Sequence, residues 1–121
     1  MEEKNKITDQ EQIILKNLYT VLNNYNISKE IYLISSDYQK SDNVKICLTK
    51  IPLGKWNTCL KIHEGVIDSI YHPSLLTAII KFIQYVAPDD EQSILMIQEF
   101  LNLSEESLLK NNSIKIRKKE L

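Results

Sequence analysis

The strongest constraint in this sequence is a pair of alternating segments, residues 44–51 and 56–62, that flank Pro52-Leu53-Gly54. Apolar and polar residues alternate in both segments, which is the period of a half-buried β-strand. A type I turn with Gly54 in the left-handed conformation is a common way to close a hairpin with a three-residue loop. This turn pairs Ile51 with Lys55. The sequence therefore predicts a β-hairpin whose register can be stated.

Each strand of the predicted hairpin has an apolar face and a polar face. In the predicted register, Cys47 lies opposite Cys59 and Lys45 lies opposite Lys61, all four on the polar face. The other face carries Val44, Ile46, Leu48, Trp56, Thr58, Leu60 and Ile62. Like charges opposite each other are mildly unfavourable. We therefore expect the polar face to be open to solvent or to an acidic partner.

The two cysteines are the first candidates for chemistry. A disulfide between Cys47 and Cys59 is geometrically conceivable, but a reducing cytosol opposes it. A zinc site needs about four ligands, and only His63 and His72 remain as soft ligands, without the short spacing of zinc motifs. We expect structural thiols, with an adventitious or regulatory disulfide as the alternative.

A helix is predicted at the start of the domain. Thr8-Asp9-Gln10-Glu11 has the pattern of a capping box, in which Thr8 accepts from the backbone and Glu11 reaches back. Apolar residues then recur every three or four positions, which predicts one buried stripe formed by Ile14, Leu18, Val21, Leu22 and Tyr25.

Two further strands complete the predicted sheet. Residues 30–36 and 66–71 are rich in β-branched and aromatic residues, and the polar segment 36–43 resembles a turn. Together with the hairpin, these segments predict a four-stranded antiparallel meander.

The pattern becomes helical after His72-Pro73-Ser74. Residues 75–86 are apolar nearly all round, which indicates a buried central helix that Pro88 ends. Asp89 and Asp90 can cap the next helix. We expect its core side to carry Ile94, Ile97 and Leu101, with Leu95 and Phe100 flanking, and we expect a last short turn from Ser104.

These elements predict an α+β fold with an N-terminal helix, a four-stranded antiparallel meander, and two to three C-terminal helices packed on one sheet face. The length of 121 residues suits one domain. We place that domain at residues 1–109 and a basic, flexible tail at residues 110–121.

The sequence contains no pattern typical of an enzyme or a cofactor site. Two glycines in the chain are too few for the usual nucleotide-binding loops. His63 and Glu64 are adjacent, so on a strand their side chains would point to opposite faces and would not cooperate. We predict a non-enzyme without a metal or cofactor.

Charge and hydropathy exclude several classes of partner. The net charge is −1 and Arg117 is the single arginine, which disfavours nucleic-acid recognition. No apolar run is long enough to span a membrane, and the polar start resembles no signal peptide. We expect a cytoplasmic protein that binds neither nucleic acid nor membrane.

The distribution of charge points instead to a protein partner. Between residues 87 and 106 there is no Lys or Arg, but there are six acidic residues: Asp89, Asp90, Glu91, Glu99, Glu105 and Glu106. The simpler explanation is that acids favour helix N-termini and that Lys45 and Lys61 keep a sheet face soluble. The functional alternative is a partner of complementary charge, with Trp56 as a possible anchor.

One segment carries a resemblance to a known family. Residues 54–65 form a Trp56-bearing strand that reaches a Glu64-Gly65 turn, and one strand and an apolar helix follow. With the order of elements over about residues 15–101, this resembles small immunity proteins of bacterial polymorphic toxin systems. The resemblance implies a cytosolic neutraliser that binds a cognate toxin domain stoichiometrically. If that toxin is a nuclease, its basic groove would face the acidic residues.

Two alternatives belong to other classes. A secretion chaperone or adaptor would also pair a sheet with helices and would usually dimerise, and the sequence leaves the oligomeric state open. A phage-encoded inhibitor of a host protein would suit the small size of the chain.

Overall fold

The structure, a computed structural model, describes residues 6–36, 45–52, 55–62 and 65–120. Its elements in chain order are α1 (Asp9–Asn24), β1 (Tyr32–Ser35), β2 (Ile46–Lys50), β3 (Trp56–Ile62), β4 (Gly65–His72), α2 (Leu75–Val86) and α3 (Asp90–Glu120). The predicted α+β class is confirmed, with one N-terminal helix, a four-stranded sheet and two C-terminal helices in the described part of the chain.

The hairpin of β2 and β3 has the predicted register. Cys47 pairs with Cys59 and Leu48 with Thr58. The Ile51 amide donates to the Lys55 carbonyl at 2.9 Å, as the three-residue loop requires. Residues 53 and 54, on which the turn type depends, lie outside the described residues.

The prediction that the whole sheet is antiparallel is wrong at one pair of strands. The strand order is β1-β2-β3-β4, but β1 runs parallel to β2, with Tyr32 opposite Ile46. The predicted turn at 36–43 lies almost entirely outside the described residues. The composition of a polar connection does not show whether the strand that follows it runs antiparallel or parallel to the strand before it. Ten extended residues can span about 33 Å, and a strand of four residues is only about 13 Å long, so either connection is sterically possible.

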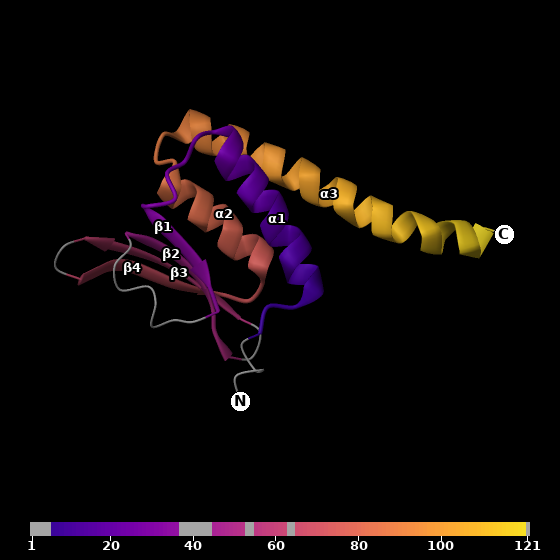
Figure 1. The fold of residues 1–121 in the computed structure, drawn as a ribbon, viewed down its shortest axis with the longest axis horizontal. Coiled ribbons are helices and arrows are strands. Elements are labelled where there is room, and N and C mark those ends of the chain that lie inside the picture. Colours follow the sequence, from indigo (N-terminus) through magenta and orange to yellow (C-terminus); the bar gives the residue numbers. More distant parts are fainter. Residues whose placement is uncertain (1–5, 37–44, 53–54, 63–64, 121) are drawn as a thin grey trace.

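The helices form two layers on one side of the sheet (Figure 1). The apolar helix α2 packs on β2, β3 and β4. Phe82 is fully buried there and meets Tyr32 of β1 edge-on, with ring centroids 5.6 Å apart. The prediction that α2 is the central buried helix is confirmed. The helix α3 packs against α1 and α2, so it forms an outer layer instead of lying on the sheet.

The helix α3 also differs from its prediction in length. It is continuous from Asp90 to Glu120, so no separate turn begins at Ser104 and the predicted tail is helical up to Glu120. No Gly or Pro occurs after Pro88, so nothing in the sequence forces the helix to end. The flexibility of residues 110–121 stays a prediction. The last part of α3 extends beyond the rest of the molecule (Figure 1).

The buried side of α3 is not the side that the sequence analysis chose. Met96 and Phe100 are fully buried, whereas Ile94 and Leu101, which we predicted to lie in the core, are 54% and 41% exposed. Leu95 is exposed as well. Apolar residues lie on nearly every side of this segment, so their spacing fits more than one stripe. The small side chains of Ser93 and Ser104 are buried, and they allow close packing along the side that faces the other helices.

The second face of the sheet is also more buried than predicted. Cys47, Thr49, Asn57 and Cys59 are at most 2% exposed, so the expectation of an open polar face is wrong along the centre of the hairpin. These side chains are uncharged, so their burial costs less than that of a charge. The Thr49 hydroxyl and the Asn57 side-chain oxygen are buried without a hydrogen-bond partner among the described residues, but the Asn57 NH2 group is bonded. The Asn57 amide donates to the Ser69 hydroxyl at 2.9 Å and to the Ile70 carbonyl at 3.1 Å.

A hydrogen-bonded ion pair joins the start of α1 to the hairpin. The predicted capping box is present, because Thr8 and Glu11 exchange hydrogen bonds between side chain and backbone. The Glu11 carboxylate also accepts from Lys50 Nζ at 2.6 Å and from Trp56 Nε1 at 2.8 Å. Lys50 Nζ donates to the Lys6 carbonyl as well, at 2.8 Å. Because Lys50 and Trp56 are cross-strand partners, one carboxylate holds both strands of the hairpin.

The surroundings of Glu11 shift its pKa in a direction that bears on stability. Burial alone would raise the pKa of this carboxyl, but the hydrogen bonds from Lys50, Thr8 and Trp56 outweigh burial and hold the pKa below its ordinary value of 4.5. A carboxyl with a lowered pKa in the folded state stabilises the fold above the unfolded pKa. That stability is lost as the pH falls through the folded pKa.

We therefore expect Glu11→Gln to remove about 2–3 kcal/mol of the free energy of unfolding near neutral pH, because Lys50 loses its counter-charge. We also expect the variant to lose less stability than the wild type as the pH falls below about 4.5. Urea denaturation across this range measures both effects. Glu106→Gln, at an exposed glutamate, is the control, and equal acid sensitivity of the wild type and Glu11→Gln would contradict the prediction.

Candidate partner-binding surface

The outward side of α3 presents a continuous row of exposed side chains. Residues three or four apart lie in line on one side of a helix. Such a row runs through Glu91, Ile94, Gln98, Leu101 and Glu105, all of which are exposed. Two apolar side chains thus lie between acidic residues, and exposed Leu95 widens the apolar part. We call the face formed by Glu91, Ile94, Leu95, Gln98, Leu101 and Glu105 the outer α3 face.

The structure places the six predicted acidic residues in three settings. Asp89, Asp90 and Glu91 are exposed at the start of α3, and the Glu91 amide donates to the Asp89 carboxylate at 3.3 Å. The helix dipole accounts for acids at this end. Glu99 is half-buried and accepts from the Asn24 amide of α1 at 3.5 Å.

Glu105 and Glu106 need a different explanation. Both are exposed, and they follow Asp90 by about four turns of helix. The effect of the helix dipole falls off within the first turn, so it does not favour acids at this distance. The ion pair found among the described residues joins Lys50 to Glu11, and neither residue belongs to α3. Glu105 lies exposed at the end of the outer α3 face.

Lys45, Lys61 and Trp56 do not join the acidic residues. Lys45 is exposed and Lys61 half-buried on the sheet, and the Lys61 amide donates to the Lys45 carbonyl, which confirms that the two residues are opposed. Trp56 is fully buried, and its indole N–H donates a hydrogen bond to the Glu11 carboxylate. It is therefore a core residue and not a surface anchor. The predicted site residues thus separate onto different layers of the fold.

The apolar part of the outer α3 face was missed by the sequence analysis. The predicted core side of this helix includes Ile94, Ile97 and Leu101, of which Ile97 is partly buried against the core. The buried stripe instead includes Ser93, Met96, Phe100 and Ser104. Because Ser93 and Ser104 are polar, this buried stripe is less apolar than the side of α3 that carries Ile94 and Leu101. Hydrophobicity alone therefore favoured the side that is exposed in the structure.

A second group of polar side chains lies between α2 and the sheet. Thr58 Oγ1 and His72 Nε2 are 2.8 Å apart, and the Tyr85 hydroxyl donates to Asp68 at 2.5 Å. Burial lowers the pKa of His72 with help from the Lys81 cation, and burial together with Asp68 raises the pKa of Tyr85. Thr58 is fully buried, so a substrate cannot reach it. We interpret this group as satisfied packing between β3, β4 and α2.

The cysteines do not form a reactive or metal-binding centre in the described structure. Cys47 and Cys59 are both buried thiols, and burial raises the pKa of Cys59, which lowers its reactivity. Among the described residues, no three His, Cys, Asp or Glu side chains are grouped as a metal site would require. His63 and Glu64 lie outside the described residues.

Comparisons with known proteins add no relative to this description. No family model, curated protein or solved structure was found to match the chain. Within the described residues, no helix combines the length and the apolar character needed to cross a membrane. The properties of the outer α3 face thus follow from its own residues alone.

The orientation of α3 can be tested with two neighbouring apolar residues. We expect Met96→Ala to destabilise the protein by about 2–5 kcal/mol, because it leaves a cavity in the core. We expect Ile94→Ala to change stability by less than about 0.5 kcal/mol, because that side chain is half in solvent. Chemical denaturation of both variants measures the difference. A larger loss from Ile94→Ala than from Met96→Ala would mean that α3 is rotated from the position described.

Proposed function

We propose that this protein is an immunity protein or antitoxin that binds and neutralises a cognate toxin domain in the cytoplasm by forming a stoichiometric complex. The observation that carries the proposal is the outer α3 face, where exposed apolar side chains lie between acidic residues in a segment, 87–106, that contains no Lys or Arg. The resemblance to immunity proteins supplies the class of partner.

The composition of this face suits a protein partner better than a small molecule. Protein interfaces commonly have an apolar centre and a polar rim. Here Ile94, Leu95 and Leu101 would form the centre, and Glu91 and Glu105 would lie at the two ends. Acidic side chains at a rim accelerate association with a basic surface and reject acidic competitors. A nucleic acid would be repelled by the same charges.

The expected partner therefore has an apolar patch bordered by Lys or Arg. A toxin whose substrate is a nucleic acid has such a basic surface at its active site. Binding of the outer α3 face over that surface would block access of the substrate, and the inhibitor itself would need no catalytic group. The tertiary position of α3 supports this mode, because its buried side anchors it to α1 and α2 while the opposite side stays exposed.

The test is co-expression with the product of the adjacent open reading frame. We expect the wild-type protein to form a 1:1 complex with that product and to restore growth to cells that express it. We expect Leu101→Asp to weaken the complex by at least about tenfold, because a charge enters the apolar centre. Leu76→Asp is the matched control, because Leu76 is also on a helix and is 36% exposed, compared with 41% for Leu101.

The electrostatic part of the proposal has its own variant. Glu105→Lys should slow association and reduce its dependence on salt, whereas Glu30→Lys, at an exposed glutamate before β1, should do neither. Association rates measured at low and high salt give the comparison. The proposal fails if no neighbouring product binds and growth is not restored, or if Leu101→Asp and Leu76→Asp have equal effects on an observed complex.

A further inference from the structure

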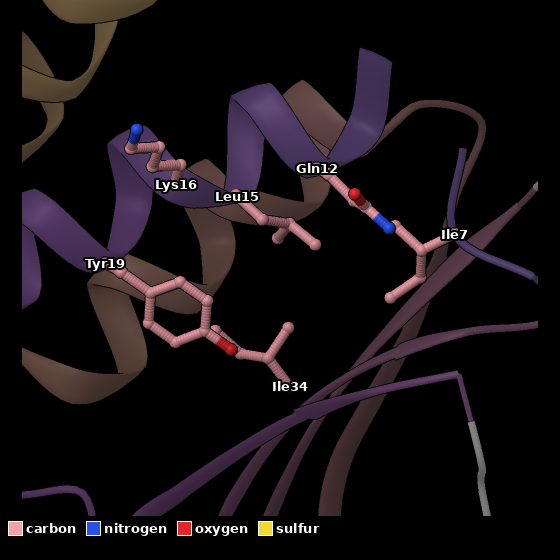
Figure 2. Close-up of a pocket in the computed structure, with 6 residues that line it drawn as sticks. All are labelled: Ile7, Gln12, Leu15, Lys16, Tyr19 and Ile34. Carbon is pink, nitrogen blue, oxygen red and sulfur yellow. The ribbon is translucent and has the colours of Figure 1, made fainter. Parts of the chain in front are cut away.

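A hollow of about 350 Å³ lies between α1 and β1. No residue of the outer α3 face lines it. Its walls are formed by Ile7, Gln12, Leu15, Lys16, Tyr19 and Ile34. Figure 2 shows Leu15 and Tyr19 reaching from α1 toward Ile34 of β1, with Ile7 at one end of the hollow. The Lys16 ammonium points away from the hollow (Figure 2). The interior is thus neutral and mainly apolar.

The strand beside this hollow is at the edge of the sheet. Among the described strands, β1 pairs with β2 alone. In the parallel register, the Ile46 amide donates to the Ile31 carbonyl at 3.0 Å, and Leu33 lies opposite Cys47. The backbone groups of a strand alternate in direction, so Ile31 and Leu33 face β2. The N–H and C=O groups of Tyr32 and Ile34 consequently point to the outer edge.

An edge strand with unpaired backbone groups is a template for another extended chain. The hollow lies beside this edge, and the Ile34 side chain belongs to both. In recognition by strand addition, backbone hydrogen bonds supply affinity and an adjacent pocket selects a side chain. Ile34 combines both features, because its backbone groups point to the outer edge and its side chain lines the hollow.

We propose that the edge of β1 binds an extended peptide segment of a protein partner as a fifth strand, and that one large uncharged apolar side chain of this segment occupies the hollow. A free small apolar ligand would leave the outward backbone groups of Tyr32 and Ile34 unused. A charged side chain would be desolvated without a partner in the neutral interior. The inference does not depend on the toxin-binding role, because it involves different residues and a different layer of the fold.

The experiment uses the full chain and a short blocked peptide in which a central leucine is flanked by threonines, because threonine favours extended backbone. At millimolar peptide, we expect the amides of Tyr32 and Ile34 to become protected from hydrogen exchange, as measured by NMR. The amide of Leu33 faces β2 and should keep its protection. Replacing the leucine of the peptide with aspartate should weaken binding by about tenfold or more.

Two variants of α1 form a matched pair. Tyr19→Lys places a charge in the wall of the hollow and should weaken peptide binding by a similar factor. Ile13→Lys alters the same helix at similar exposure, 42% against 40% for Tyr19, but Ile13 does not line the hollow, so binding should be unchanged. Circular dichroism establishes that both variants are folded.

Several results would overturn the inference. They are the absence of protection at Tyr32 and Ile34 with millimolar peptide, equal binding of the leucine and aspartate peptides, and equal loss of binding in Tyr19→Lys and Ile13→Lys. None of these results bears on the complex formed through the outer α3 face, since that complex is measured with a different partner and with variants of α3.

Discussion

The Glu11 carboxylate joins the start of α1 to the hairpin of β2 and β3. One oxygen accepts from the Lys50 ammonium and the Thr8 amide, and the other accepts from the Trp56 indole. Burying a carboxylate is costly unless its oxygens are paired, and here both oxygens are. The same contact caps α1 and ties together the end of β2 and the start of β3. This contact and the buried apolar stripe of α1 together hold the helix against the rest of the fold.

Much of the remaining surface depends on where α1 lies. Together with α2 it forms the layer on which α3 rests, and together with β1 it encloses the neutral hollow. Because α3 lies on helices and not on the sheet, only a narrow stripe around Met96 and Phe100 is buried. The outer α3 face therefore stays in solvent with Glu91 and Glu105 at its ends, and the proposed association with a basic protein rests on these charges. The edge of β1 has backbone hydrogen-bonding groups beside a neutral hollow, so it is suited to an extended apolar segment.

The sequence alone determined the features that depend on neighbouring residues. The capping box at Thr8 and Glu11 and the register of Cys47 with Cys59 follow from local spacing. The burial of α2 follows from its mainly apolar sequence. Likewise, the acidic residues of α3 were identifiable from sequence because the charge of a residue does not depend on the fold.

Only the tertiary structure decided the direction of β1, the buried side of α3 and the burial of Trp56. A polar connector is compatible with either strand direction, since its composition does not record where it leads. The segment that contains Ile94, Met96 and Leu101 has apolar residues on several sides, and contact with α1 and α2 selected one of them. Likewise, the partner of Trp56 is Glu11, 45 residues away. Such contacts join residues that no local pattern connects, and they decide which side chains remain at the surface to meet a partner.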